Sequence, residues 1–329
     1  MKESNGKRYW NSLEERRFRQ IGCAEIILAC LLYGGNVIAG RIVAPQVPPF
    51  ALSAVRAILG LAVLGPFLMR LGPELRPKGE DWGRLALQGF LAITLAYSTF
   101  AWGMRFSPAI NASIIFATFP AVNLLLLVLF WRVKPAGIQL IGIIMAFAGL
   151  TIVAAHGSVE RLLSVSFAPT DGILLLNVFA VALSNILSQK LMERYAPLVV
   201  SAYSLFFGFL GLLPWALWEI RVQGWHLSWQ GWVFLFYMGC CVSGLAVVLN
   251  FAAIYRIGSG VVAIFNNLNP IFAIALAALF LGEPLHLYHV IGIILVLSGV
   301  GLSLRSDQRL NNPIRPSGTC CNQAKITYR

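Results

Sequence analysis

Long apolar stretches separated by short polar connections limit the folds open to this chain. Hydrophobic residues make up 58% of the sequence and charged residues only 12%, about half the charged share of a soluble globular domain. About 20 apolar residues in a helix cross the roughly 30 Å hydrocarbon core of a bilayer. The sequence therefore predicts an all-α polytopic membrane protein, with little room for a soluble catalytic domain.

Ten stretches are long enough to form transmembrane helices. We expect these helices at residues 22–44, 50–71, 82–104, 107–130, 135–156, 170–192, 197–219, 229–253, 257–281 and 285–305. Residues 1–21 form a polar N-terminal segment before the first helix. Residues 306–329 lack apolar periodicity and contain turn-forming Asn-Asn-Pro and Pro-Ser-Gly sequences, so we expect a disordered tail there.

The basic residues predict the orientation of the chain. Of the 25 Lys and Arg residues, most fall in the two terminal segments and in every second connection. Basic segments stay on the cytoplasmic side, so we expect both termini to be cytoplasmic in a multi-pass protein of the inner (plasma) membrane. The asymmetry also explains the net charge of +12, which favours contact with anionic lipid and requires no nucleic-acid partner.

The second half of the chain repeats the first. Residues 107–152 align with residues 257–302 without a gap, and Pro120 aligns with Pro270. Internal repetition in apolar segments indicates duplication, and in membranes such duplications frame transport pathways.

The earlier part of each half also aligns, at an offset that places Asn36 on Asn185. Each repeat thus comprises five helices, at residues 22–156 and 170–305. An odd number of crossings makes the second copy start on the opposite side of the membrane, so the two repeats are predicted to be inverted.

Several motifs together resemble one known family. They are the YGGN sequence at Tyr33 to Asn36, Arg56 early in the second helix, Pro120 and Pro270, and the LGE sequence ending at Glu283. In this pattern the chain resembles the EamA branch of the drug/metabolite transporter superfamily over its whole membrane part.

This resemblance implies a ten-helix carrier in which the first four helices of each repeat surround a central cavity and the fifth helices act as outer supports. Relatives of this kind include exporters of amino acids and other small metabolites. The first repeat departs from the pattern, because Trp131, Arg132 and Val133 stand where the second has LGE. A role of the acidic turn therefore cannot be assumed in both halves.

Polar side chains near the middle of a helix are costly in hydrocarbon, so they face the bundle interior or a wet cavity. On this basis the predicted substrate site comprises Tyr33, Asn36, Tyr97, Ser98, Thr118, Asn185, Tyr237, Asn266, Asn267 and Asn269. Ser113, Ser184 and Ser243 lie at similar depth. The alternative is that these groups only join helices, through hydrogen bonds of roughly 0.6 to 2 kcal/mol.

The two aligned prolines predict breaks in the helices at residues 107–130 and 257–281. Proline removes an amide donor, which frees the carbonyl of Phe116 before Pro120 and of Asn266 before Pro270. Free carbonyls at membrane depth are tolerated where they are buried in protein or line water. The breaks therefore either border the substrate site or only shape helix packing.

Arg56 is expected to serve as a structural or gating group more than as a substrate contact. It either extends to the outer interface or pairs with Asp171 or Glu283.

Paired glycines predict a close helix crossing. Gly142 and Gly149 are two turns apart, as are their counterparts Gly292 and Gly299. Small residues at this spacing let helix backbones approach, so the helices at 135–156 and 285–305 should pack together. They could also mediate association into a homo-oligomer.

These features favour a secondary transporter that exports small metabolites, foremost amino acids or related zwitterionic and weakly polar compounds, by alternating access. The alternatives are a non-transporting scaffold subunit and, least favoured, a membrane-embedded enzyme. No cofactor, metal site or catalytic residue is predicted. The middle third of every span lacks carboxylates and histidines, which favours facilitated efflux or exchange over proton antiport.

Overall fold

A computed structural model describes residues 12–69, 77–107, 109–132, 135–164, 171–281, 284 and 286–306. The predicted disordered tail, most of the N-terminal segment and Glu283 lie outside these residues. Within them the regular structure is helical, and ten helical stretches are long and apolar enough to cross a membrane. The predicted fold class and number of transmembrane helices are therefore confirmed.

Several of these crossings consist of more than one helical element. The first repeat contains α1 (Ser12–Val43), α2 (Pro49–Met69), η2 (Gly79–Asp81), α3 (Trp82–Gly89), η3 (Phe90–Leu95), α4 (Ala96–Phe106), α5 (Ala109–Ala117), α6 (Phe119–Trp131) and α7 (Gly137–Ala154). The short α8 (Val159–Leu163) lies between the repeats. The second contains α9 (Asp171–Leu191), α10 (Pro197–Gln223), α11 (Trp229–Phe236), η4 (Tyr237–Ala246), α12 (Val247–Ile257), α13 (Ser259–Phe265), α14 (Leu268–Leu281) and α15 (Leu287–Ser306).

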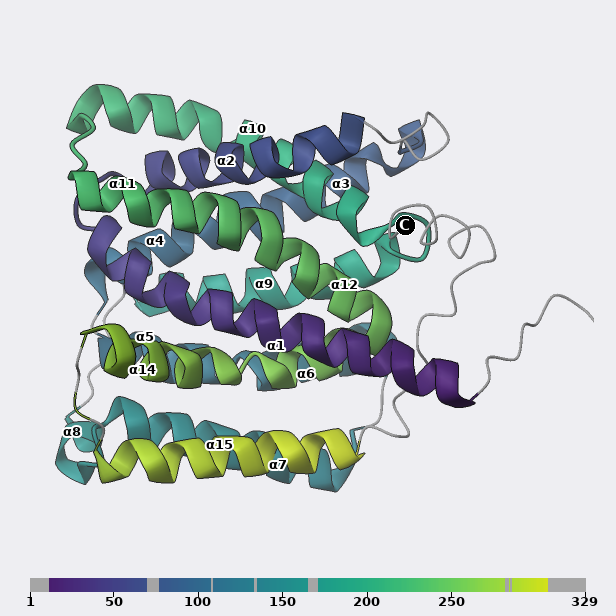
Figure 1. The fold of residues 1–329 in the computed structure, drawn as a ribbon, viewed down its shortest axis with the longest axis vertical. Coiled ribbons are helices and arrows are strands. Elements are labelled where there is room, and N and C mark those ends of the chain that lie inside the picture. The colour runs from purple at the N-terminus through teal and green to yellow at the C-terminus, as the bar shows by residue number, and fades with distance from the viewer. Residues whose placement is uncertain are drawn as a thin grey trace, which may run out of the picture.

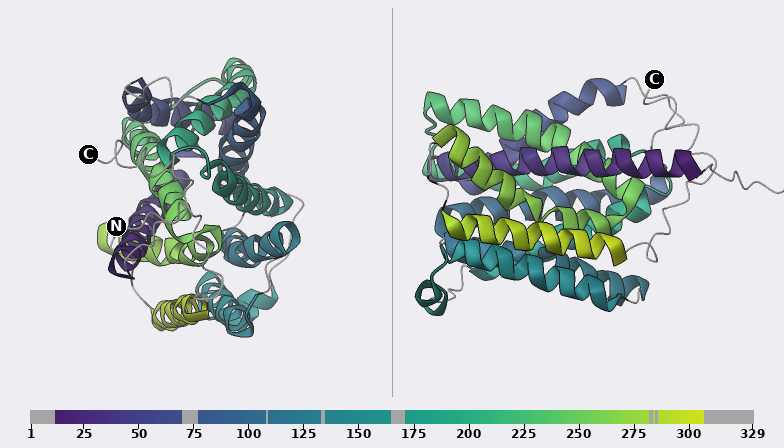
Figure 2. Two further views of the ribbon diagram at one scale, coloured as in Figure 1. Left: turned by 90° about the vertical axis from the view of Figure 1, so that its right-hand side faces the viewer. Right: turned by 60° about the horizontal axis from the view of Figure 1, so that its bottom comes forward.

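The transmembrane helices run roughly side by side, with α2 and α10 at one edge of the molecule and α7 and α15 at the other (Figure 1). The two further views show the same arrangement from one end and from below (Figure 2). Helix α1 begins and α15 ends at the same end of the bundle. We call this end the terminal face, and the other end the opposite face.

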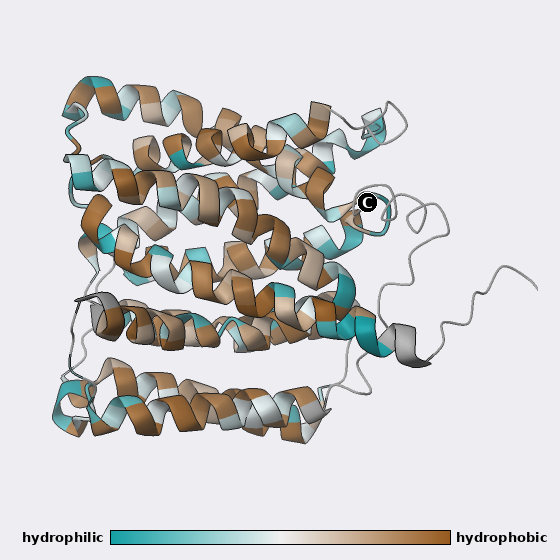
Figure 3. Cartoon of the chain, viewed as in Figure 1, coloured by the Kyte–Doolittle hydropathy of each residue, from teal (hydrophilic) through white to brown (hydrophobic). Residues whose placement is uncertain are grey.

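Hydrophobic residues cover most of the length of the helices, and hydrophilic residues gather toward their ends (Figure 3). Many large apolar side chains on the periphery are exposed, such as Leu129, Ile144, Trp218 and Leu279. Such a surface is unsuited to water but is expected for helices that face lipid.

Two crossings break where the aligned prolines predict. Helix α5 ends at Ala117 and α6 begins at Phe119, just before Pro120. Likewise α13 ends at Phe265 and α14 begins at Leu268, just before Pro270. Both breaks lie well inside their crossings, where a non-helical backbone must be covered by protein or border a cavity.

Two further crossings contain a π-helical segment, which the sequence analysis did not predict. These segments are η3, between α3 and α4, and η4, between α11 and α12. They lie in the third helix of each repeat, at corresponding depth. A π segment changes the direction in which the following side chains point and is frequent at functional sites.

Helices α7 and α15 pack closely against each other, as their glycines predict. A Cβ atom on Gly149 would lie 2.7 Å from the carbonyl oxygen of Gly292, and one on Gly142 would lie 2.5 Å from that of Gly299. These distances leave no room for a side chain. Only glycine at these positions permits the observed approach of the two backbones.

We therefore expect Gly299→Ala to destabilise the protein. The added Cβ would lie 2.8 Å from the Ala146 nitrogen and still nearer the Gly142 carbonyl, and overpacking of this kind costs about 1 to 3 kcal/mol. A melting temperature measured in detergent should fall by several degrees. Gly301→Ala in the same helix is the matched control, because no atom lies within 4 Å of its Cβ position; equal melting temperatures for the two variants would contradict the packing argument.

Candidate functional site

A cavity of about 270 Å³ lies among the helices of both repeats. This volume is near the lower end of the roughly 300 to 1,000 Å³ usual for small-molecule sites. Its apolar wall includes Phe100, Phe116, Phe119 and Phe251. Its polar lining consists of Tyr33, Asn36, Arg56, Tyr97, Asn177, Ser184, Asn185, Asn250, Asn266, Asn267 and Asn269.

The breaks and π segments surround this cavity. Ala92 and Ile93 of η3 and Val242 of η4 line it, as do Asn266 and Pro270 at the break between α13 and α14. The irregular backbone at membrane depth therefore lies where water or a ligand can reach it.

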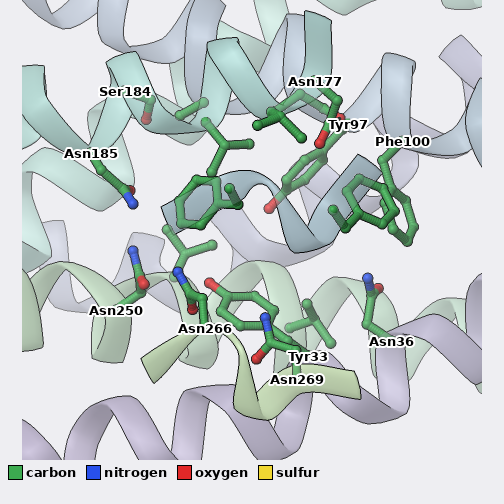
Figure 4. A pocket seen from close by; sticks show the side chains of 18 of the residues that line it. Tyr33, Asn36, Tyr97, Phe100, Asn177, Ser184, Asn185, Asn250, Asn266 and Asn269 are labelled. Carbon is green, nitrogen blue, oxygen red and sulfur yellow. Dashed lines mark hydrogen bonds between the residues drawn. The ribbon is translucent and has the colours of Figure 1, made fainter. Parts of the chain in front are cut away.

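Nine of the predicted residues line the cavity. They are Tyr33, Asn36, Arg56, Tyr97, Asn185, Asn266, Asn267, Asn269 and Pro270. Figure 4 shows Tyr33 and Asn36 on α1 and Asn269 on α14 below the cavity, with Tyr97 and Asn185 reaching into it from above. Residues far apart in the sequence are thus brought to one space.

Four predicted residues do not line the cavity. The hydroxyls of Ser98 and Thr118 donate to carbonyl oxygens about one turn earlier in the chain, so they are satisfied locally. The Tyr237 hydroxyl donates to the carbonyl oxygen of Leu32 at 2.8 Å and joins η4 to α1. Pro120 is buried outside the lining. Depth alone did not reveal which way these side chains point.

Asn177 and Asn250 line the cavity but were not predicted. Asn177 precedes Asn185 by eight residues, which places both on one face of α9 together with Ser184. This spacing was a usable signal. Asn250 was missed because the helix was expected to end at residue 253, whereas α12 continues to Ile257 and so places Asn250 deeper.

Asn177 is already bonded within the protein. Its side-chain nitrogen donates to the Ala96 carbonyl oxygen at 2.7 Å and to the Thr99 hydroxyl at 3.0 Å. It therefore joins α9 to α4 beside the cavity, and we assign it a structural part in shaping the wall.

Other polar atoms of the lining have no partner among the described residues. They are Oδ1 of Asn36, Nδ2 of Asn185, Oδ1 of Asn269, the hydroxyl oxygen of Tyr97 and Nε of Arg56. In Figure 4, Asn185 and Asn250 point toward each other from α9 and α12. Buried polar groups are normally hydrogen-bonded, so unpaired donors and acceptors around one cavity indicate a place for a polar ligand or water.

Arg56 corrects an expectation. It neither reaches an interface nor pairs with Asp171: its side chain is buried, and its guanidinium carbon lies 4.4 Å from the centre of the Tyr97 ring. The carboxylate of Asp171 instead accepts from the Asn111 amide at 2.7 Å. The other proposed partner, Glu283, lies outside the described residues. Arg56 thus places a cation on the cavity wall.

The family follows from comparison with known proteins. The model of the EamA-like transporter family matches residues 20–155 and 169–305. The chain belongs to this family. An uncharacterized transporter of Bacillus subtilis, YetK, is similar to it at 25% identity over 287 residues, which cover 86% of each chain.

A second relative has a more informative name. The "Probable terminal-alkyne amino-acid exporter" of Streptantibioticus cattleyicolor is 25% identical over 228 residues, or 69% of this chain and 74% of the relative. A solved crystal structure covers 90% of this chain and 99% of its own, with a TM-score of 0.72 and 18% identity. That likeness shows the fold alone. The family and its members establish transport as the activity of the chain.

The cavity is closed more tightly toward the terminal face. From Val261 to Phe265 every side chain of α13 is buried, and α13 packs against both α6 and α9. Its counterpart in the first repeat, α5, leaves Ser113 and Phe116 partly exposed. In the described part of the chain α5 makes no comparable contact with α14 or α1.

Polar contacts reinforce the closure at the terminal face. The Gln189 side-chain oxygen accepts from the Ser259 amide at 3.1 Å and from its hydroxyl at 2.6 Å, while the Asn123 amide donates to the Ser259 carbonyl at 3.3 Å. We call Asn123, Gln189 and Ser259 the polar latch.

The polar latch has no counterpart in the other repeat. The aligned residues are Ala273, Gly40 and Ala109, which have no polar side-chain atoms. The two ends of the cavity thus differ in the polar side chains that surround them, although the repeats share a fold.

Removing the latch acceptor should open the cavity toward the terminal face. In Gln189→Leu, Ser259 loses its partner on α9, so α13 should separate more readily from α9. We expect several-fold faster labelling of a single cysteine at position 181, on the cavity wall, by an impermeant maleimide applied from the terminal face in an otherwise cysteine-free protein.

Gln46→Leu is the matched control, because Gln46 accepts from the Ser228 amide at the opposite face. Unchanged labelling in Gln189→Leu, or an equal increase in both variants, would contradict a latch at the terminal face.

Proposed function

We propose that this chain exports small zwitterionic or weakly polar metabolites, foremost amino acids, by alternating access through the central cavity. The observation that carries the proposal is the unpaired polar groups of Asn36, Asn185 and Asn269 on an otherwise largely aromatic and aliphatic wall. Such a wall accepts an apolar side chain, while amide oxygens and nitrogens bind the polar end of the molecule.

The two repeats support alternating access. In one arrangement the contacts of α13 close the terminal face; exchanging the conformations of the repeats would instead close the opposite face around α5. Inverted repeats make both arrangements available to one chain. With both termini in the cytoplasm of the inner membrane, as the basic residues predict, the cavity described here is closed toward the cytoplasm.

The lining also bears on energy coupling. Its described residues include no aspartate, glutamate or histidine, and such residues are the usual proton carriers within transport pathways. We therefore propose facilitated efflux or exchange. The homologue from Streptantibioticus, named as an amino-acid exporter, supports the substrate class, whereas a scaffold would have no use for unpaired polar groups around a cavity.

Removal of the lining amides should impair export. Cells that express Asn36→Ala, Asn185→Ala or Asn269→Ala should lose most of the tolerance to toxic amino-acid analogues that the wild-type chain confers, because each substitution deletes a polar group that faces the cavity. The measurement is growth across a series of analogue concentrations, with equal membrane expression of each variant.

Ser98→Ala and Thr118→Ala serve as controls at similar depth, since both hydroxyls bond only to nearby carbonyls of the chain. They should retain wild-type tolerance. If the three asparagine variants grew as well as these controls, the proposed site would be refuted; if no form of the chain conferred tolerance to any analogue, the proposed substrate class would be wrong.

A further inference from the structure

The cavity wall carries one formally charged side chain among the described residues, Arg56. Helix α2 begins at Pro49, so Arg56 lies about 10 Å along the helix from that end. Its exposed fraction is only 2%. A guanidinium at this depth is far from bulk water, and a buried charge normally requires a partner.

The buried and partly buried acids of the described spans are engaged elsewhere. The Glu25 carboxylate is 2.9 Å from the guanidinium of Arg256. Asp81 lies 3.2 Å from Arg194 and accepts from the Tyr195 hydroxyl. Asp171 accepts from Asn111, and Glu219 accepts from the amides of Phe50 and Ala51 in the first turn of α2. None of these acids lines the cavity.

The protein itself supplies Arg56 with a weaker partner. The guanidinium carbon lies over the Tyr97 ring, which attracts a cation by its negative face but does not accept hydrogen bonds from all of the guanidinium N–H groups. Nε has no hydrogen-bond partner, and no hydrogen bond from the guanidinium to another described residue is found. The donors of Arg56 are therefore held in place but not used.

We propose that Arg56 binds a carboxylate group of the transported molecule. This inference rests on the proposed function, and it narrows the substrate class to small carboxylates, amino acids included. A guanidinium presents two parallel N–H donors that match the two oxygens of a carboxylate. Contact with the Tyr97 ring holds the guanidinium at the cavity wall, and a carboxylate in the cavity would neutralise the charge of that wall.

The charge is confined to one repeat. The aligned position in α10 holds Leu205, which is uncharged. A single cation in a small, mainly apolar cavity suits one carboxylate better than a phosphate group, which binds through more donors and more charge. For an amino acid, the unpaired amide oxygens of Asn36 and Asn269 are acceptors suited to the ammonium group.

The test is binding to the purified full-length protein in detergent, by calorimetry, with two matched series of probes. One is leucine, leucinamide, isoamylamine and 4-methylpentanoate; the other is phenylalanine, phenylalaninamide, phenethylamine and 3-phenylpropionate. Each is measured with the wild-type chain, Arg56→Gln and Arg56→Lys. Inorganic phosphate is included as a second kind of anion.

In at least one series we expect the wild-type chain to prefer the carboxylates to the amide and the amine. Arg56→Gln should weaken carboxylate binding about tenfold or more, the usual effect of losing hydrogen bonds to a charged group, and leave the amide unchanged or tighter. Arg56→Lys keeps the positive charge but lacks the two parallel N–H donors, so it should retain part of the preference for carboxylates. This variant keeps the test decisive if Arg56→Gln fails to fold.

A purely structural arginine would give a different result, because its loss would weaken all ligands equally. The inference would be overturned if the wild-type chain and Arg56→Lys both bound acid and amide with equal affinity. It would also be overturned if the wild-type chain bound none of the carboxylates, or bound phosphate more tightly than the carboxylates. Proteoliposome transport separates the two proposals: export of amide and acid alike refutes only the assignment of Arg56, whereas carboxylate binding without transport refutes only the proposed export.

Discussion

The need to satisfy every backbone amide and carbonyl without water shapes this molecule. In hydrocarbon an unpaired peptide group is costly, so the chain crosses as helices whose hydrogen bonds are internal. That constraint makes each departure from regular helix informative. The breaks before Pro120 and Pro270 and the π segments η3 and η4 lie well inside their crossings, and each of them contains or directly adjoins residues that line one cavity.

The same constraint determines which polar side chains form hydrogen bonds within the protein and which remain available to a ligand. Most hydroxyls at mid-depth, such as those of Ser98 and Ser204, bond to carbonyls of their own helix and carry no information about ligands. Asparagines cannot be satisfied so simply, because an amide presents both donors and an acceptor. Three asparagines with an unpaired side-chain atom, Asn36, Asn185 and Asn269, line the cavity. Together with Arg56 they give its wall polar groups that an aromatic lining alone would lack.

The two repeats share a fold but differ where they close the cavity. The polar latch at the terminal face aligns with alanine and glycine in the other repeat, and α13 is more deeply packed than α5. Duplication gives the chain two similar halves. Because aligned positions now hold different residues, the contacts at the two ends of the cavity differ. Under the proposed alternating access, the closures at the two ends could therefore be altered separately by substitution.

The sequence by itself determined the ten helices, the repeat, the breaks at the prolines and the glycine crossing of α7 and α15, because each depends on length, periodicity or the geometry of one residue type. It also indicated seven cavity residues through their depth, whereas Arg56 was expected to be a structural or gating group. Only the tertiary structure decided that Tyr237 bonds to α1, that Asn250 lines the cavity and that Arg56 lies on the Tyr97 ring. Depth follows from position along one helix, but the direction of a side chain depends on which neighbouring helices surround it, and that is fixed only when all of them pack.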